Sequence, residues 1–275
     1  MSARPAPFAS GLERRVALVT GALGLLGKEH CRALSRSGVR VVAGDLDGRA
    51  TRAFASALEA ETGVPALGAA LDVTDTLSIT AVEAATRAGF GPIDILVNNA
   101  GINDRVEDPT SGGFPFEGYP LEAWDRVMRV NVTGTFLCCQ IVGTGMVRSG
   151  RGSIINIAST YGLVAPRPTL YQGSDGQPRF FKSPAYPTSK GAVLAFTRYL
   201  AAQWGPTGVR VNALVPGGVE NGQRPSFRSR YSEHTPLGRM ARPDDYHGAL
   251  LFLASDASSY MTGAHLVVDG GWTAW

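Results

Sequence analysis

The sequence predicts an α/β protein with a doubly wound, Rossmann-like parallel sheet of about seven strands in a three-layer α/β/α arrangement. Three observations predict this fold. Short runs rich in Val, Ile and Leu alternate with stretches of helical period along the chain. Most of these runs are apolar throughout, as in strands whose two faces are both covered by helices. Three closely spaced glycines follow the first run, just before the first helical stretch.

The expected elements follow one another without an internal repeat or a linker. Right-handed crossovers between parallel strands leave few other topologies. We expect residues 1–13 to form a flexible tail and residues 14–275 to form one domain. We expect strands at 16–20, 39–44, 65–71, 93–98, 152–158, 209–215 and 265–269, and helices at about 25–37, 48–61, 76–88, 120–147, 187–204 and 243–254.

Three polar segments interrupt this alternation, at residues 102–119, 165–184 and 218–236. The first two are long and rich in Pro and Gly, and loops longer than about 12–15 residues are usually functional or disordered. We expect all three to overhang the carboxyl edge of the sheet, where doubly wound folds bind ligands. They are therefore predicted to determine which substrate is bound.

Composition and charge narrow the class of protein. The chain has 275 residues, 44% hydrophobic and 18% charged, with a net charge of +3. So small a charge does not favour nucleic acid or a membrane surface as partner. Three cysteines without CxxC spacing and four scattered histidines predict neither a disulfide framework nor a metal site. No apolar run reaches about 18 residues, so we expect no membrane span and a cytoplasmic location.

A nucleotide site is predicted after the first strand, where Gly21, Gly24 and Gly27 are three residues apart. Glycine at such a turn lets backbone amides approach a pyrophosphate at the N-terminus of the next helix. Asp45 ends the second strand, where a carboxylate binds the ribose 2′-hydroxyl and repels a 2′-phosphate. We therefore expect NAD rather than NADP. The alternative, that Asp45 caps the next helix, is weaker because Asp47 is better placed to cap it.

Two further strand ends are candidates for this site. Asp72 ends the third strand and could reach the adenine, although helix capping explains it nearly as well. NNAG, residues 98–101, ends the fourth strand with small and amide side chains that suit a flat ring or a ribose, or simply a turn.

Acid–base chemistry is predicted at YPTSK, residues 186–190. Tyr186 and Lys190 are four residues apart and fall on one helical face. A nearby ammonium favours the phenolate, which would bring the phenol pKa of about 10 toward neutrality. Such a pair can move a proton on and off an alcohol oxygen. On its own the spacing also fits an ordinary solvated helix.

The order of these motifs resembles that of the short-chain dehydrogenase/reductase family, in particular its single-domain branch. The resemblance extends over residues 15–271 and is carried by TGALGLLG (20–27), Asp45, NNAG (98–101), Asn131, Ser159, YPTSK (186–190) and Pro216-Gly217. It implies a nicotinamide-dependent oxidoreductase that transfers hydride to or from an alcohol or carbonyl carbon. It also implies a homo-oligomer, a dimer or tetramer.

The resemblance implies a role for each matching residue. Tyr186 would be the proton donor and acceptor, and Lys190 would lower its pKa and hold the nicotinamide ribose. Ser159 would hydrogen-bond the substrate oxygen, or else only cap a strand end. Asn131 would hold a water that connects Lys190 with solvent, or else only pin a helix bend. The NAD contacts would be Gly21, Gly24, Leu25, Leu26, Gly27, Asp45, Asp72, Val73, Asn99, Ala100, Gly101, Tyr186, Lys190, Pro216, Gly217 and Val219.

Three departures from the family pattern leave alternatives open. The glycine spacing, with Leu25 where a glycine is usual, resembles the longer branch that includes sugar-nucleotide epimerases. An epimerase or dehydratase that uses bound NAD transiently is therefore an alternative, as is a non-catalytic NAD-sensing regulator. The segment between Ser159 and Tyr186 is longer than usual. Asn221 stands where the family often has a threonine that contacts the carboxamide.

The substrate is expected to be a small polar molecule, such as a sugar or polyol derivative. The predicted loops are rich in polar and basic side chains, although charges that only keep the loops soluble explain them equally well. The basic residues are Arg167, Arg179, Lys182, Arg224, Arg228 and Arg230.

Overall fold

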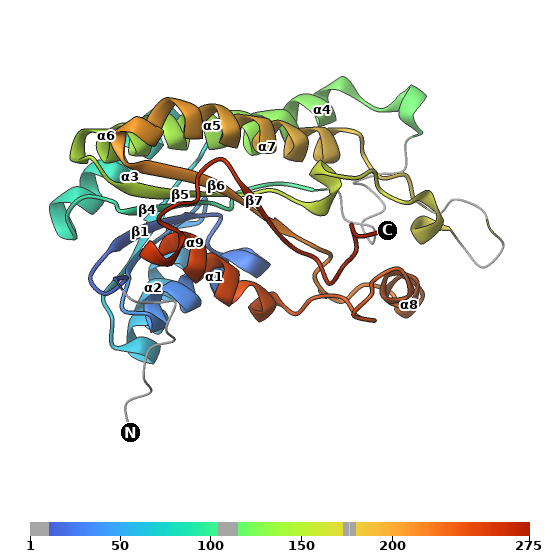
Figure 1. Cartoon of the computed structure of the whole chain (residues 1–275), viewed down its shortest axis with the longest axis horizontal. Helices are drawn as coiled ribbons and strands as arrows, with labels where there is room; N and C mark the ends of the chain where they lie inside the picture. The colour runs from blue at the N-terminus through green and yellow to red at the C-terminus, as the bar shows by residue number, and fades with distance from the viewer. Residues whose placement is uncertain (1–10, 104–114, 173–175, 177–179) are drawn as a thin grey trace.

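A seven-stranded parallel sheet forms the centre of the molecule, seen nearly edge-on in the computed structural model of Figure 1. The structure describes residues 11–103, 115–172, 176 and 180–275. The strand order is β3-β2-β1-β4-β5-β6-β7, so the chain reverses its direction of growth between β1 and β4. The strands are Val16–Thr20 (β1), Arg40–Asp45 (β2), Ala66–Ala70 (β3), Ile95–Asn98 (β4), Gly152–Ile157 (β5), Val209–Pro216 (β6) and His265–Val268 (β7).

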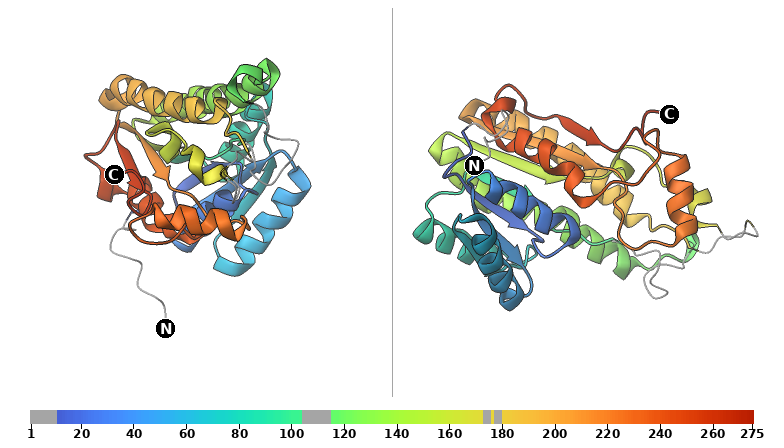
Figure 2. Two further views of the ribbon diagram at one scale, coloured as in Figure 1. Left: turned by 90° about the vertical axis from the view of Figure 1, so that its right-hand side faces the viewer. Right: turned by 90° about the horizontal axis from the view of Figure 1, so that it is seen from below.

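Helices cover both faces of the sheet, which confirms the predicted doubly wound fold (Figures 1 and 2). One face carries α1 (Leu25–Arg36), α2 (Gly48–Thr62) and α9 (His247–Ala254). The other carries α3 (Thr76–Gly89), a long helix over residues 121–149, and α7 (Ala185–Trp204). The two faces form separate apolar cores, and the five inner strands between them are almost wholly buried, whereas the edge strands β3 and β7 are partly exposed. This burial explains why the strand sequences are apolar without alternation.

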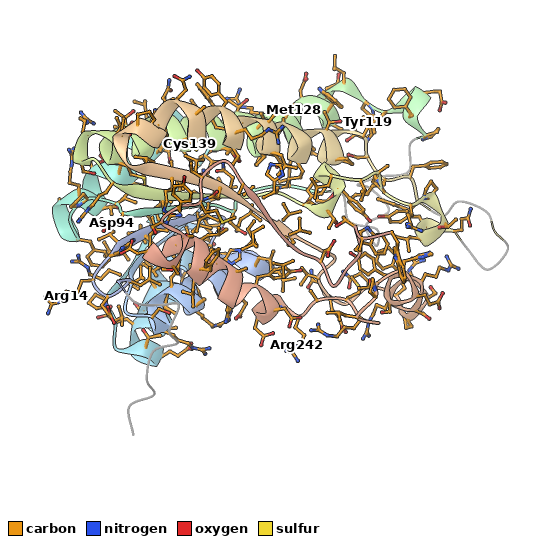
Figure 3. All side chains as sticks on the ribbon, in the orientation of Figure 1. Arg14, Asp94, Tyr119, Met128, Cys139 and Arg242 are labelled. Carbon is orange, nitrogen blue, oxygen red and sulfur yellow. The ribbon has the colours of Figure 1, made fainter. Side chains whose placement is uncertain are left out.

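The long helix contains two π-helical segments. It runs through α4 (Leu121–Met128), η3 (Arg129–Thr133), α5 (Gly134–Cys138), η4 (Cys139–Gly143) and α6 (Thr144–Ser149). Cys139 lies between this helix and the sheet, where Asn98 donates to its Sγ at 3.2 Å (Figure 3). By length and composition Leu121–Ser149 would be able to cross a membrane, which corrects the expectation that no segment is apolar enough. A core helix passes the same test, and this one packs on the sheet.

The predicted elements match the structure closely except at the substrate loops. All seven strands and the six expected helices are present, with ends that differ by a few residues, and the last helix is preceded by the 3-10 turn Pro243–Tyr246 (η8). The segment 218–236, expected to be a loop, contains helix α8 (Pro225–Glu233). Leu12, expected in a flexible tail, is fully buried in the core beside α1 and α9.

A small third core connects α8 with the other carboxyl-edge segments (Figure 1). In the segment 165–184 a 3-10 turn, Pro168–Tyr171 (η6), places its last two residues against α8. The buried members of this core are Leu170, Tyr171, Phe180, Tyr231, Met240 and Trp272. Helix α8 is stabilised because Phe227 and Tyr231, one turn apart, pack their rings against the 165–184 segment and the C-terminal end of the chain.

Candidate active site

The turn between β1 and α1 requires glycine at two positions. Gly21 has a φ of +62°, and a Cβ there would lie 2.7 Å from Ala100 Cα. A Cβ at Gly27 would lie 2.1 Å from the carbonyl oxygen of Gly21. At Gly24, the N-cap of α1, no side chain caps the helix. The first-turn amides and the positive end of the helix dipole are thus available to an anion.

A cavity of about 350 Å³ opens beside this turn, at the reversal point between β1 and β4. This is the position at which doubly wound sheets bind ligands. Gly27 packs under the turn and does not line the cavity. Ten of the residues expected to contact NAD do: Gly21, Gly24, Leu25, Leu26, Asp45, Asp72, Val73, Asn99, Ala100 and Gly101.

The carboxylate of Asp45 lies at the rim of this cavity. It accepts hydrogen bonds from the backbone amides of Leu23, at 2.9 Å, and Leu46, at 2.8 Å. Asp47 caps α2 by accepting from Arg49 and Ala50, so Asp45 is not needed as the cap. Each carboxylate oxygen of Asp45 keeps further acceptor capacity toward the cavity.

The other expected contacts in this cavity also support the strand ends. Asp72 accepts from the amide and the hydroxyl of Thr74, both at 2.8 Å, so it stabilises its own turn while it lines the cavity. The cap of α3 is Asp75 instead. Asn99 donates to the carbonyl oxygens of Thr20 and Gly21 at 3.0 and 2.9 Å and thereby ties β4 to the glycine turn.

Tyr186, Ser159 and Lys190 come together where β5 ends and α7 begins. The Ser159 side chain hydrogen-bonds Tyr186. Lys190 Nζ donates to the carbonyl oxygen of Ile157 at 2.7 Å and lies 5.7 Å from the centre of the Tyr186 ring. A Cβ at Gly101 would lie 3.6 Å from Lys190 Nζ, so the lysine reaches the floor of the nucleotide cavity. The three side chains therefore connect the predicted nucleotide site with the space beside Tyr186.

Burial shifts the pKa values of this tyrosine and lysine. Burial raises the pKa of Tyr186, while its hydrogen bond with Ser159 lowers that pKa by a smaller amount. Burial also lowers the pKa of Lys190 to about 8. The expected net lowering of the Tyr186 pKa by Lys190 is therefore wrong for this structure. The largest cause of the raised pKa is burial, which disfavours the charged phenolate.

Asn131 is fully engaged by protein groups. Its Oδ1 accepts from the amide of Ile102 at 2.8 Å, and its Nδ2 donates to the Ile102 carbonyl and to Ser189 Oγ, both at 3.0 Å. Asn131 lies in η3, and π-helical segments are often found at functional sites. The side chain thus fixes the chain after β4 to α7, beside Lys190, as a positioning residue.

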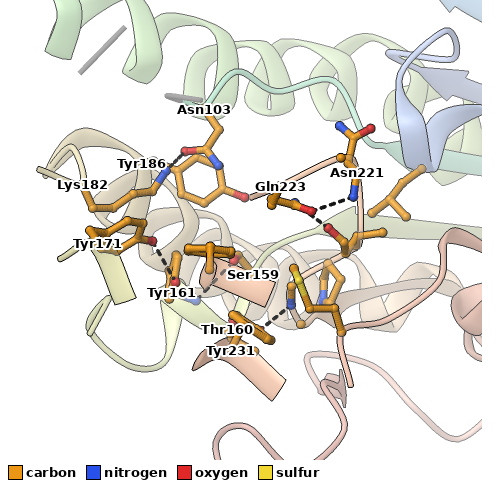
Figure 4. A pocket seen from close by; sticks show the side chains of 18 residues that line it. Asn103, Ser159, Thr160, Tyr161, Tyr171, Lys182, Tyr186, Asn221, Gln223 and Tyr231 are labelled. Carbon is orange, nitrogen blue, oxygen red and sulfur yellow. Dashed lines mark hydrogen bonds between the residues drawn. The ribbon is translucent and has the colours of Figure 1, made fainter. Parts of the chain in front are cut away.

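A second cavity, of about 470 Å³, has Tyr186 in its lining (Figure 4). Leu26 lines both cavities, so the two adjoin. Ser159, Tyr186 and Asn221 line the second one. So do Pro216, Gly217 and Val219, which were expected, like Tyr186, among the NAD contacts and do not line the cavity at the glycine turn. Its other polar lining residues come mainly from the three segments expected to bind the substrate: Asn103, Tyr171, Lys182, Gln223 and Tyr231. Thr160 and Tyr161, just after Ser159, also line it, and sequence reasoning did not indicate them.

Of the basic side chains expected around the substrate, Lys182 lines this cavity. The described arginines of the set make other contacts. Arg228 pairs with Glu220 at 2.5 Å, Arg230 donates to backbone carbonyls of the 165–184 segment, and Arg167 lies over the Trp272 ring. Arg224 is the N-cap residue of α8, and Arg179 lies outside the described residues.

Comparison with known proteins identifies similar chains of nearly the same length. A family model described as enoyl-(acyl carrier protein) reductase matches residues 21–273. Galactitol 2-dehydrogenase (L-tagatose-forming) of Cereibacter sphaeroides is 38% identical over 96% of this chain and 97% of its own. D-threitol dehydrogenase of Mycolicibacterium smegmatis is 38% identical over 95% of this chain and 94% of its own.

A solved structure shares the fold at full length. It is a gluconate 5-dehydrogenase from Burkholderia cenocepacia in complex with NADP and tartrate. It matches with a TM-score of 0.83 and 32% identity and covers 96% of each chain.

Proposed function

Because this chain belongs to the short-chain dehydrogenase/reductase family, we propose that it is an NAD-dependent dehydrogenase of a polyhydroxylated secondary alcohol. One observation carries this proposal most directly. Tyr186 and Ser159 line a polar cavity that adjoins the cavity at the glycine turn, and Lys190 lies beside both Tyr186 and Gly101. An alcohol bound in the polar cavity would lie beside Tyr186.

The residues of the glycine-turn cavity and Asp45 would hold the nicotinamide cofactor, which when bound would supply the hydride acceptor for alcohol oxidation or the hydride donor for carbonyl reduction. Tyr186 takes the proton of the alcohol hydroxyl during oxidation and returns it during reduction. The Ser159 hydroxyl donates to the reacting oxygen as negative charge develops on it. Lys190, beside Tyr186 and next to Gly101, would hold the nicotinamide ribose, and its ammonium would offset part of the cost that burial places on the Tyr186 phenolate. Asn131 keeps the backbone at Ile102 in place.

NAD is the proposed cofactor because of the charge at the rim of the first cavity. The Asp45 carboxylate would accept hydrogen bonds from a ribose diol and would repel a 2′-phosphate. Arg49 is exposed, and it is not among the described residues that line this cavity. The neighbour solved with NADP makes the choice between the two cofactors the first point to measure.

A polyhydroxylated substrate fits the second cavity. Its lining combines the amides of Asn103, Asn221 and Gln223 with tyrosine hydroxyls, groups that recognise alcohols in a mostly preformed site. The similar dehydrogenases act on galactitol and D-threitol, which supports a substrate of this class. The charged side chains of these loops are not needed for this argument, because the amides and hydroxyls alone supply donors and acceptors for an alcohol.

The test is to incubate the purified protein with NAD or NADP and a panel of polyols, sugars and hydroxy acids. Formation of reduced nicotinamide is followed by its absorbance. We expect net reduction of NAD by at least one polyhydroxylated substrate. Isomerised product without net reduction would indicate an epimerase instead. NAD binding with no product from any substrate would indicate a non-catalytic sensor, and either result would overturn the proposal.

A further inference from the structure

Tyrosine hydroxyls supply much of the polar surface of the second cavity, and they differ in their partners. Four of its described lining residues are tyrosines. The Tyr186 hydroxyl pairs with Ser159, and the Tyr231 hydroxyl accepts from a backbone amide. The hydroxyls of Tyr161 and Tyr171 bond each other, with 3.2 Å between the oxygens, and have no other partner among the described residues. In Figure 4 a dashed line joins these two side chains, which we call the Tyr161–Tyr171 pair.

This pair keeps hydrogen-bonding capacity for a ligand. Two hydroxyls carry two hydrogens, and the bond between them uses one, so the other remains free whichever oxygen donates. The separation of 3.2 Å is also longer than the roughly 2.7–2.8 Å that is usual for O–H···O, so the bond is weak. A ligand group that accepts from one oxygen and donates to the other can therefore bind both.

An alcohol hydroxyl matches the pair because it is both a donor and an acceptor. An ether or ketone oxygen would only accept, and an ammonium would only donate. Burial raises the pKa of Tyr171 to about 12 and raises the pKa of Tyr161 well above its usual range, so both phenols stay neutral. The pair is therefore suited to hold a neutral hydroxyl and not to transfer a proton.

Tyr161 is held next to the side chains proposed to react. It lies in the 3-10 turn η5 (Thr160–Gly162), whose N-cap is Ser159, and its amide donates to Ser159 Oγ at 3.2 Å. A Cβ at Gly162 would lie 2.8 Å from the carbonyl carbon of Lys190, so this turn packs directly on α7. The turn is thus fixed relative to Ser159 and to the helix that carries the proposed proton carrier.

Tyr171 is held by the third core. The centre of its ring lies 5.5 Å from that of Phe180 and 5.7 Å from that of Phe227. The ring is almost fully buried among these aromatic side chains, and its hydroxyl bonds Tyr161 at the lining of the cavity. Both halves of the pair are therefore in place before a ligand arrives, as is usual for small-molecule sites.

We propose that the Tyr161–Tyr171 pair binds a second hydroxyl of the substrate, while Ser159 and Tyr186 hold the hydroxyl that reacts. The inference rests on the proposed dehydrogenase function and specifies its substrate class, an alcohol with a further hydroxyl. It assigns Tyr161 and Tyr171 the role of specificity residues. A purely structural role, in which the pair only joins η5 to the 165–184 segment, would affect all alcohols alike.

The experiment compares four-carbon alcohols that differ in the hydroxyls they carry. D-threitol has a hydroxyl on every carbon, butane-1,2,4-triol lacks the one next to the reacting carbon, and butane-2,3-diol lacks both terminal ones. Butan-2-ol has only the reacting hydroxyl. We measure kcat/KM for each compound with NAD and with NADP. Every hydroxyl that the pair could bind in threitol is thus absent from the triol or from the diol, and not from both.

Tyr161→Phe and Tyr171→Phe keep the rings and remove one hydroxyl each. Each should lower kcat/KM for threitol by roughly 5- to 100-fold, the range expected when a buried hydrogen-bonding group is left unpaired. The double variant should lose more than either single variant. Butan-2-ol should be insensitive to all three variants, and so should either the triol or the diol, whichever lacks the hydroxyl that the pair binds.

The matched control is Tyr260→Phe, which removes a hydroxyl from a fully exposed tyrosine. It should leave kcat/KM at the wild-type value for every compound. The KM for NAD should stay unchanged in all variants, because neither tyrosine lines the cavity at the glycine turn. Equal losses for threitol, the triol, the diol and butan-2-ol would show a structural role and overturn the inference, as would no loss for threitol.

Failure of this inference differs from failure of the proposed function. Either of the two overturning results leaves a working dehydrogenase. If wild type turns over no compound of the series, calorimetric titration of threitol and butan-2-ol into the protein with NADH tests the pair on binding alone. Tighter binding of threitol that is lost in the double variant would support the pair, and equal binding of the two alcohols would overturn it. The proposed function itself fails only if the wider panel of polyols, sugars and hydroxy acids gives no reduced nicotinamide.

Discussion

The ring of Tyr231, on α8, stacks on the ring of Trp272, near the end of the chain, with 4.2 Å between the ring centroids and 8° between the ring planes. Both side chains are almost fully buried. The Tyr231 hydroxyl also accepts a hydrogen bond from the amide of Gly218 at 2.6 Å. This contact joins α8, the C-terminal segment and the turn after β6 beside the second cavity. It accounts for a helix in a segment with few apolar residues.

Truncating Trp272 should therefore weaken the packing of α8 beside the second cavity. For Trp272→Ala we expect about 3–5 kcal/mol lower stability to urea, as for other large aromatic residues removed from a core. Tyr231→Phe keeps the stacking and leaves the Gly218 amide unpaired, so we expect a loss of about 1–3 kcal/mol. In both variants the KM for the alcohol should rise more than the KM for NAD. An equal rise of the two KM values would argue that α8 has no special connection with the substrate cavity.

Replacing Tyr186 by Phe should remove the proposed proton carrier. We expect kcat to fall by about 10²–10⁴-fold, the usual contribution of a general acid or base. NAD binding, measured by fluorescence titration, should remain because the glycine turn and Asp45 are untouched. Tyr199→Phe is the matched control, since Tyr199 lies on the same helix and is 60% exposed. Turnover of Tyr186→Phe at the rate of this control would reject the assignment.

Replacing Asp45 by Ala should shift the cofactor preference toward NADP. The variant lacks the carboxylate that would bind the ribose diol and repel a 2′-phosphate. The ratio of kcat/KM for NAD to that for NADP should fall by at least tenfold. Asp47→Ala is the control: it should cost about 1 kcal/mol of stability as a lost helix cap and leave this ratio unchanged. A ratio that responds equally to both substitutions would mean that the loop, and not the Asp45 charge, sets the preference.

His30 predicts an acid-sensitive stability. It is fully buried on α1, and neither ring nitrogen has a hydrogen-bond partner among the described residues. Burial, and next the nearby charge of His247, lowers its pKa from 6.5 to about 3. The unfolded chain therefore binds the proton more readily, so the stability of the fold is full above pH 6.5 and falls as the pH drops from 6.5 toward 3.

The slope from His30 alone should reach about 1.4 kcal/mol per pH unit within that window. His30→Leu, which cannot be protonated, should lose stability less steeply in urea titrations between pH 6.5 and 4.5. At pH 8 His30 is neutral in both the folded and the unfolded chain. The difference in free energy of unfolding between the two proteins at that pH is therefore the reference value. Parallel curves for the two proteins would show that His30 does not titrate on unfolding.

Local patterns in the chain were sufficient to predict the framework. The apolar runs of the inner strands are continuous because both faces of the sheet are covered there, and this is visible in the residue types. The turn glycines, Asp45 at the end of β2 and Asp47 as a helix cap depend on neighbours in the sequence. Tyr186 and Lys190 share a helical face for the same reason. Such features are set by backbone sterics and by short-range hydrogen bonds.

Contacts between distant segments decided the rest. Helix α8 depends on rings contributed by residues some 40 to 60 positions away, and no periodic pattern in α8 reveals them. Lys182 donates a hydrogen bond to Asn103 beside the Tyr186 ring only because the chain after β4 and the 165–184 segment meet there. The pKa of Tyr186 is raised because desolvation depends on everything packed around the hydroxyl, whereas the YPTSK motif records only one of its neighbours. How deeply the Tyr186 hydroxyl is buried, and which loops lie around it, are therefore decided only by the assembled fold.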